Sequence, residues 1–225
     1  MEKKYEFVED DVRLWKGRAI RRIVAIRDFD DVKKGDLGGY IESESNLSQE
    51  DTCWVYDNAK VYGDARVYGD AEIYGGAKVY GCAEVYGDAE VYGDAEVYGD
   101  AKAYGRTKIH GDARVYGDAK VYGYAEVYGD AEVYGDAKAY RYAEVYGDAK
   151  VYGYAEVYGD AKVHGDARVY GDAKVYGRAE VYGRTEVYGR TEVYGDAEVH
   201  GDARVYGRTK FYGNTKVDDD EKSFS

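Results

Sequence analysis

Residues 85–102 read Val-Tyr-Gly-Asp-Ala-Glu-Val-Tyr-Gly-Asp-Ala-Glu-Val-Tyr-Gly-Asp-Ala-Lys, and this six-residue unit decides the fold. The unit repeats 27 times between Val55 and Lys216 with no inserted or deleted residue. So short a unit cannot bury an apolar face by itself, and successive units must therefore wind and stack on one another. The sequence predicts a solenoid, and any function has to be read from its array.

Alternation along the repeat assigns its two sides. Successive side chains of an extended segment point in opposite directions, so Val and Ala share one side and Tyr and the charged residue share the other. We expect Val and Ala to face inward. The Gly and Asp that follow Tyr tolerate the unusual backbone angles of a corner. Three repeats make an 18-residue triangular coil, and 27 repeats make nine coils with a length of roughly 43 Å at about 4.8 Å per strand.

Two patterns test whether the coil has three sides or four. Opposite charges favour neighbouring strands, and 17 of 24 outward charged pairs that lie three repeats apart have opposite signs. Because 16 of 23 pairs that lie four repeats apart are opposite too, charge does not distinguish a triangle from a square. The three histidines favour the triangle, since their spacings of nine and six repeats are multiples of three and not of four.

The outward tyrosines are expected to stabilise the coils. Rings stacked about 4.8 Å apart lie within the favourable range for offset aromatic pairs, and each ring covers a large area. The small apolar interior of each coil offers little burial against the entropic cost of ordering the whole coil. We therefore expect three external tyrosine ladders that stabilise the fold together with the backbone hydrogen bonds.

Composition limits the classes of partner and location. The chain of 225 residues has a formal net charge of −13 and no proline. Phosphate contacts need a dominant basic surface, so direct nucleic-acid binding is not expected, and a cationic or neutral partner is favoured. No apolar run suits a signal peptide or a membrane span, which predicts a cytoplasmic protein without membrane contact. Cys53 and Cys82 are expected to be reduced, and no cofactor is implied.

The ends of the chain lie outside the repeat. Residues 1–54 are expected to form an N-terminal β cap over the end of the solenoid, with strands at 4–8 and 19–26 and a turn region at 28–36. The expected apolar anchors of the cap are Trp15, Phe29 and Trp54. Residues 55–216 form the solenoid, and residues 217–225 form an acidic tail that we expect to guard the open end against end-to-end growth.

These residues carry a resemblance to known proteins. The hexad resembles the repeat of left-handed parallel β-helix proteins, in which an aliphatic residue is followed four places later by a small one, as in Val61 and Ala65. The segments Arg27-Asp-Phe-Asp-Asp-Val-Lys-Lys-Gly-Asp-Leu-Gly-Gly-Tyr-Ile-Glu42, Asn46-Leu-Ser-Gln49 and Cys53-Trp-Val-Tyr-Asp-Asn-Ala59 are similar to the lead-in segment of the YdcK-type β-solenoid proteins, often labelled transferases by fold analogy. The resemblance covers residues about 20 to 216 and implies an all-β, single-stranded, left-handed β-helix.

The resemblance also implies what an enzyme of this kind would contain. Hexapeptide-repeat acyltransferases use a histidine base and loops that interrupt the coils to shape a cleft for the acyl donor. Here His110, His164 and His200 all replace the repeat tyrosine, which places them in one column of a three-sided coil. At three coils and two coils, roughly 14 and 10 Å, they are too far apart to share one metal ion. No loop interrupts the array, so we expect these histidines to fill the ladder, with catalysis by one of them as the alternative.

Two sets of corner residues are further candidates. A column of aspartates would stack at successive coils, where like charges repel, and either calcium between the coils or Asx-type bonds to the corner backbone would relieve this. A set of arginines lies at the corners of one turn and just beyond it, where a phosphate or carboxylate partner would bind, or where they are simply solvated. The aspartates are Asp94, Asp112, Asp130, Asp148 and Asp166, and the arginines are Arg178, Arg184, Arg190 and Arg208.

The leading hypothesis is a non-enzymatic structural or partner-binding rod, a scaffold whose partner is a protein or a glycan that stacks on the tyrosines. The alternative is an acyltransferase-like enzyme of the hexapeptide-repeat type that assembles as a trimer. A third hypothesis is mimicry of DNA by the acidic rod, which the interspersed Lys and Arg disfavour. The chain is expected to be a monomer or a homotrimer.

Overall fold

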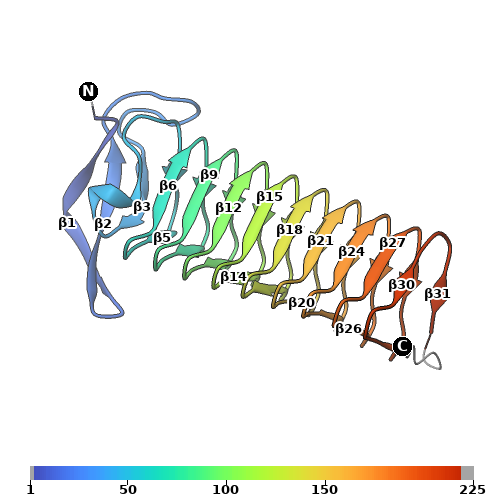
Figure 1. Cartoon of the computed structure of the whole chain (residues 1–225). Helices are drawn as coiled ribbons and strands as arrows, with labels where there is room; N and C mark the ends of the chain where they lie inside the picture. The colour runs from blue at the N-terminus through green and yellow to red at the C-terminus, as the bar shows by residue number, and fades with distance from the viewer. Residues whose placement is uncertain (1–2, 219–225) are drawn as a thin grey trace.

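The computed structural model describes residues 3–218 as an elongated shaft of stacked coils with a β-hairpin at its N-terminal end (Figure 1). Three sheets run along the shaft, and together they make a three-sided β-solenoid of about ten turns. The described residues contain no α-helix, only the short 3₁₀ helix η1 (Glu44–Asn46). The prediction of an all-β triangular solenoid is confirmed.

Each sheet takes one strand from every turn. The first sheet contains, in spatial order, β1 (Tyr5–Trp15), β2 (Arg18–Ala25), β3 (Leu37–Ile41), β5 (Lys60–Val61), β8 (Lys78–Val79), β11 (Glu96–Val97), β14 (Arg114–Tyr116), β17 (Glu132–Tyr134), β20 (Lys150–Val151), β23 (Arg168–Val169), β26 (Glu186–Val187) and β29 (Arg204–Val205). The second contains β4 (Trp54–Val55), β7 (Glu72–Ile73), β10 (Glu90–Val91), β13 (Lys108–Ile109), β16 (Glu126–Val127), β19 (Glu144–Val145), β22 (Lys162–Val163), β25 (Glu180–Val181), β28 (Glu198–Val199) and β31 (Lys216–Val217). The third contains β6 (Arg66–Gly69), β9 (Glu84–Gly87), β12 (Lys102–Gly105), β15 (Lys120–Gly123), β18 (Lys138–Arg141), β21 (Glu156–Gly159), β24 (Lys174–Gly177), β27 (Glu192–Gly195) and β30 (Lys210–Phe211).

The register between turns is three repeats throughout the array. Glu96 of β11 pairs with Arg114 of β14, for example, and the strands are parallel. Side-chain ion pairs follow the same spacing, as between Lys78 and Glu96 at 2.7 Å. The expected pairing of opposite charges one coil apart is therefore present, and three sides rather than four are confirmed.

The interior is filled by the aliphatic side chains of the repeat. The Val and Ala positions of the coils are almost completely buried, as at Val133 and Ala131, both 0% exposed. They form one continuous cluster from the cap to Val217. The assignment of Val and Ala to the inner side is confirmed, because the period of two leaves no other arrangement that buries both.

The outer side carries three tyrosine ladders, as predicted. The rings of Tyr80 and Tyr98 stack with centroids 4.8 Å apart and planes 2° apart. The tyrosines also make a contact that was not predicted: a hydroxyl donates to the Glu of the next coil, as from Tyr80 to Glu96 at 2.9 Å. The sequence contains the signal for this bond, since Tyr and Glu share the outer side and their spacing places them diagonally across neighbouring coils.

The cap combines a hairpin with an additional turn of the solenoid. Strands β1 and β2 pair antiparallel, and β2 pairs antiparallel with β3. Strand β3 then pairs parallel with β5, and Leu47 bridges to Val67 of the third sheet. The segment between β3 and β4 thus completes one irregular turn ahead of the array, which gives about ten turns rather than nine.

The expected strand at residues 4–8 is too short. β1 continues to Trp15 through a register shift between Phe7 and Val12, which lets the acidic stretch between them stay in the strand. Two of the expected anchors plug the end of the core, where Trp54 meets Phe29 with ring centroids 5.4 Å apart. Trp15 instead packs on a separate small cluster that contains Tyr40 and Tyr62.

No helix within residues 3–218 is long and apolar enough to cross a membrane. The predicted acidic tail lies outside the described residues from position 219 onward.

Corner glycines set the distance between turns. The glycine that follows the outward aromatic residue adopts a positive φ in each repeat that has one, and a Cβ added to Gly159 would lie 3.0 Å from the backbone nitrogen and oxygen of Gly177 one coil on. Arg141 occupies the same corner position with φ +65°, in a region that ordinary L-residues avoid. The chain therefore carries local strain in the repeat 139–144.

We expect Arg141→Gly to raise the free energy of unfolding by about 1 kcal/mol, because the left-handed conformation is unstrained in glycine. Urea denaturation followed by circular dichroism measures the change. In the matched variant Gly159→Ala, one coil on, stability should instead fall. An unchanged or lower stability of Arg141→Gly would show that Arg141 makes compensating contacts.

Candidate functional site

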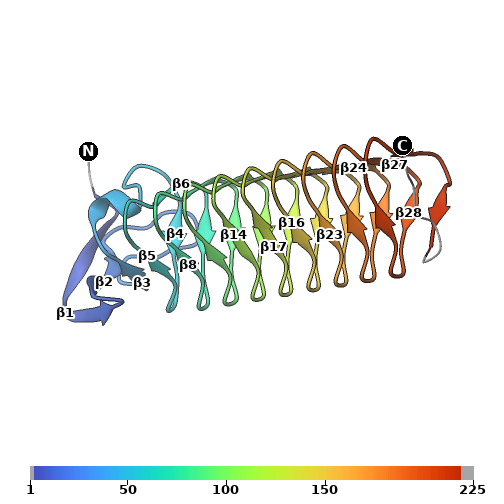
Figure 2. The ribbon, with the colours of Figure 1, turned by 60° about the horizontal axis from the view of Figure 1, so that its bottom comes forward.

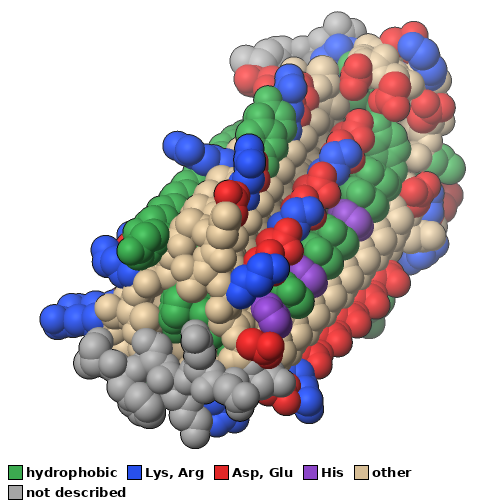
Figure 3. All heavy atoms as spheres, turned by 90° about the vertical axis from the view of Figure 1, so that its right-hand side faces the viewer, with side chains coloured by type: hydrophobic (Ala, Val, Ile, Leu, Met, Phe, Trp, Pro, Cys, Tyr) green, Lys and Arg blue, Asp and Glu red, His purple; other side chains and the backbone are tan. Residues whose placement is uncertain are grey.

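The three histidines lie in one row on the second sheet, as their spacing predicted. In Figure 3 the purple histidine side chains follow a green stripe beside a row of alternating acidic and basic side chains. His110 stacks between Tyr92 and Tyr128 with ring centroids 4.6 and 5.0 Å away, and His164 stacks in the same manner. His200 stacks on Tyr182 at 5.3 Å. The imidazoles thus take the place of tyrosine rings in the ladder.

The ladder keeps the histidine rings neutral but gives them no orienting partner. Burial lowers the pKa of His110 and His164, so both are neutral near pH 7. Among the described residues neither ring is hydrogen-bonded to a carboxylate that would orient it for proton transfer. Asp218 lies 4.0 Å from His200, and the charges of Glu126 and Glu90 act on His110.

The aspartate column runs along the corner between the second and first sheets. Burial and the neighbouring charges of Asp130 and Asp166 raise the pKa of Asp148, which shows the expected repulsion within the column. Across residues 3–218, Asp94 to Asp166 form no Asx-type bond. The backbone amides of Asp94 and Asp112 join the ladder instead, donating to the carbonyls of Gly111 and Gly129 at 2.9 and 3.0 Å. Carboxylates of neighbouring coils in this column face each other in pairs, and the five do not converge on one point where a metal ion could bind.

The candidate arginines are spread over the three corners of the shaft. Arg178, Arg184 and Arg190 follow strands of the third, second and first sheets respectively, so each faces a different direction. Arg184 pairs with Asp202 at 2.7 Å, and Arg190 approaches Asp172 at 3.7 Å. The structure therefore does not bring them together into one pocket. A shallow depression of about 440 Å³ lies at Arg184.

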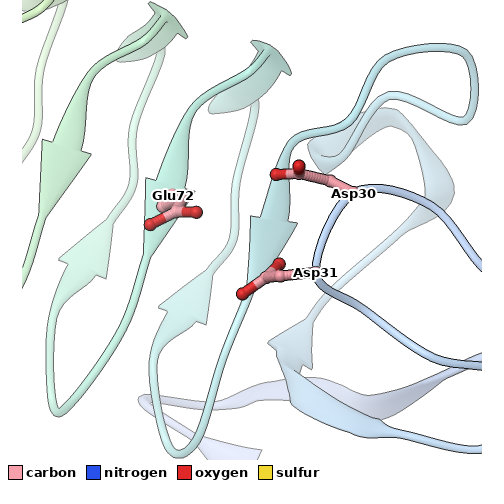
Figure 4. Close-up of side chains that lie close together, drawn as sticks. All are labelled: Asp30, Asp31 and Glu72. Carbon is pink, nitrogen blue, oxygen red and sulfur yellow. The ribbon is translucent and has the colours of Figure 1, made fainter.

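A converging carboxylate cluster was missed by sequence reasoning. Asp30 and Asp31 of the cap loop approach Glu72 of β7, and single ligand atoms of the three lie within 4.8 Å of one another (Figure 4). Burial, with Asp31 as the next cause, raises the pKa of Glu72, and Tyr56 donates a hydrogen bond to Asp31 at 2.8 Å. Among the described residues this is the sole group of three acidic or histidine side chains with metal-like spacing. The loop packs on the shaft through tertiary contacts that no local pattern reveals.

A second group was missed although the sequence shows it. Tyr124, Tyr142 and Tyr154 stand at the corner position usually held by Asp, and all three are exposed. Tyr142 belongs to the strained repeat that contains Arg141. Departures from a strict repeat are themselves a signal, because a change that strains the corner has no structural advantage.

Comparison with known proteins gives a limited match. No protein family model matches the chain. The chain is 41% identical over 56 residues to a protein of Escherichia coli (strain K12) described as "Uncharacterized acetyltransferase YdcK". The match covers 25% of this chain and 17% of the relative. The chain therefore spans less than a fifth of that relative's length.

The histidines make a prediction about pH. Because the folded chain lowers the pKa of His110 and His164, it binds fewer protons than the unfolded chain as the pH falls through the unfolded value of about 6.5. We expect the melting temperature to fall from about pH 7.5 to about pH 5.5 for this reason. The double variant His110→Tyr/His164→Tyr should show a smaller fall, measured by differential scanning calorimetry. A fall of equal size in both proteins would assign the effect to other groups.

The aspartate column makes a prediction about calcium. Calcium takes six to eight oxygen ligands, and neighbouring carboxylates of a column supply too few. We expect the melting temperature to be the same with EDTA and with added calcium chloride. A decrease with EDTA that is lost in Asp130→Asn/Asp148→Asn would place the ion in the column, whereas a decrease lost in Asp31→Asn would place it in the cluster with Glu72.

Proposed function

We propose that the chain is a rigid β-solenoid rod that binds a protein or glycan partner and has no catalytic activity of its own. The observation that carries this proposal is the uninterrupted stack. In the views of Figures 1 and 2 the coils of the array follow one another without a protruding loop between them. Within residues 55–217 the register stays at three repeats per turn from the first strand pair to the last.

The surface supports the same proposal. Its depressions are shallow, and the 530 Å³ depression that Asp118, Lys120 and Tyr154 help to line is bordered mainly by charged side chains. Ligand pockets for small molecules are concave and mostly apolar, with a few placed polar groups. Long flat sides with stacked tyrosines and alternating charges instead suit an extended macromolecular contact. The arginines Arg178, Arg184, Arg190 and Arg208 would offer anionic groups of a partner separate contacts around the shaft.

A second candidate function is acyl transfer. It is favoured by the description of the Escherichia coli relative as an acetyltransferase, although the match covers 17% of that protein. In this hypothesis the chain forms a trimer, and His110, His164 or His200 acts as the base at a site between neighbouring shafts. The stacked environment of these histidines speaks against it.

Titration with acetyl-coenzyme A distinguishes the two functions. For the rod we expect no heat of binding in isothermal titration calorimetry at saturating acetyl-coenzyme A, and light scattering should give a monomer. Micromolar binding by a trimer, abolished in His110→Tyr/His164→Tyr/His200→Tyr, would establish the enzyme and refute the rod. The triple variant should keep the fold, because tyrosine is the residue of the repeat at each position.

A further inference from the structure

The cap covers the first ring of two of the three tyrosine ladders. On the first sheet this ring is Tyr62, which is 4% exposed and packs in the cluster with Trp15. On the second sheet it is Tyr56, which donates a hydrogen bond to Asp31 of the cap loop at 2.8 Å. The cap thus ends these two ladders with its own side chains.

The ladder on the third sheet ends differently. Its first ring, Tyr68, stacks on Tyr86 with ring centroids 4.7 Å apart and planes 5° apart. Within the part of the chain that the structure describes, no second ring and no cation contacts Tyr68. One of its two stacking positions therefore has no aromatic partner.

A serine stands where this ladder would continue toward the cap. The amide of Ser48 donates to the carbonyl of Val67 at 2.9 Å, in the same way as the amide of Tyr80 donates to Val97 at 3.0 Å. Ser48 therefore occupies the position one coil before Tyr68. In each later coil of the third sheet this position carries a tyrosine. A hydroxymethyl group thus takes the place of a ring.

A depression of about 320 Å³ lies at this position. Its lining residues are Glu44, Ser45, Leu47, Ser48, Gln49, Arg66, Val67 and Tyr68. Pockets for small molecules measure roughly 300–1,000 Å³, so this depression is at the small end of the range. It suits one ring rather than a large cofactor.

Most polar side chains of the depression already have partners. Glu44 pairs with Lys3 at 2.7 Å, and the side-chain oxygen of Gln49 accepts the amide of Lys4 at 2.9 Å. The hydroxyls of Ser45 and Ser48 are hydrogen-bonded to neighbours in the same loop. These contacts hold the wall of the depression in place.

Arg66 is the exception. Among residues 3–218 it makes no hydrogen bond and no ion pair. Glu84, which lies beside it on the next strand, is bonded to Lys102 at 2.9 Å and to the hydroxyl of Tyr68 at 3.3 Å. The guanidinium of Arg66 therefore keeps its donors available at the edge of the depression.

The ladder itself shows which group a ring at this position would meet. The hydroxyl of a ladder tyrosine points to the residue that stands two places before the tyrosine of the next coil, as Tyr68 points to Glu84, two places before Tyr86. For a ring at the position of Ser48, that residue is Arg66. Arginine can only donate, so the fitting ring carries an oxygen that accepts.

We propose that this depression binds the side chain of a tyrosine in a protein partner, with its ring stacked on Tyr68 and its phenol oxygen accepting a hydrogen bond from Arg66. The proposal rests on the partner-binding function and specifies a protein rather than a glycan. An aromatic ring is favoured because the coil spacing matches the separation of offset aromatic pairs. A neutral phenol also suits a site whose rim carries the acidic Glu44 as well as Arg66.

The test measures the binding of N-acetyl-tyrosinamide to the full chain by saturation-transfer difference NMR. N-acetyl-phenylalaninamide serves as the comparison, because it has the ring and lacks the phenol oxygen. We expect the tyrosine amide to bind about 2- to 10-fold more tightly, the effect of one hydrogen bond. Methyl β-D-glucopyranoside tests the glycan, and we expect weaker binding from it than from either amide.

The variant Ser48→Tyr fills the site with the residue of the repeat. It should weaken binding of the tyrosine amide at least about 5-fold, because the added ring takes the stacking position on Tyr68. The matched control is Asp100→Tyr, which adds a tyrosine at the corner where the chain itself has Tyr154. This control should bind as the unmodified chain does.

A second variant tests the hydrogen bond without filling the depression. Arg66→Met should bind the two amides about equally. Arg114→Met, which removes an outward arginine of the first sheet, should keep the preference for the tyrosine amide. Circular dichroism is used to confirm the fold of all variants, and Arg66→Met decides the matter if Ser48→Tyr does not fold.

Four results would overturn the proposal: no binding of the tyrosine amide, equal binding of both amides by the unmodified chain, undiminished binding by folded Ser48→Tyr, or tighter binding of the glucoside. Each would remove the tyrosine site while the rod function stands, because the acetyl-coenzyme A titration does not depend on Ser48 or Arg66. Acetyl-coenzyme A binding by a trimer would remove the rod function whatever the amides show.

Discussion

The backbone ladder between turns is the interaction on which the rest of the structure depends. Amides that recur along the repeat donate to carbonyls of the next coil, as from Glu96 to Ala113 at 2.9 Å, and this fixes the turn at three repeats. The ladder requires the corners to lie almost in contact, which the glycines permit and a Cβ at Gly159 would obstruct. One constraint thus determines the turn length, the spacing of the coils and the residue type at the corner.

The spacing of the coils also sets the spacing of the aromatic and charged side chains on the surface. Rings that recur once per coil must stack, and Tyr80 and Tyr98 do so at 4.8 Å. Charges that recur once per coil must face each other, which produces ion pairs such as Lys78–Glu96 and repulsion such as that on Asp148. A regular rod therefore has few means of building a site except by departing from its own repeat. Arg106, Tyr124 and Tyr142, which replace the usual corner aspartate, are departures of this kind.

The same regularity bears on the proposal that the shaft has no catalytic activity. A histidine in a ladder is held flat between two rings, as His110 is between Tyr92 and Tyr128, and no carboxylate among the described residues is hydrogen-bonded to it. An enzyme site needs groups that converge on one point, whereas a ladder directs its side chains outward in parallel rows. Among residues 3–218 a converging group is found at the cap, where Asp30 and Asp31 of the cap loop approach Glu72.

Local periodicity was sufficient to predict the shaft. Alternation placed Val133 inside and Tyr134 outside, and the spacing of His110, His164 and His200 placed them in one column, because both properties depend on counting residues along a strict repeat. The separation of Arg178, Arg184 and Arg190 onto three corners follows from the same count. What only the tertiary structure decided was how irregular parts meet the regular one. Trp15 packs on a separate cluster rather than at the end of the core, and the cap segment forms an additional turn. Asp30 and Asp31 approach Glu72. Sequence periodicity could not predict these contacts, because they depend on the paths of loops that have no repeat.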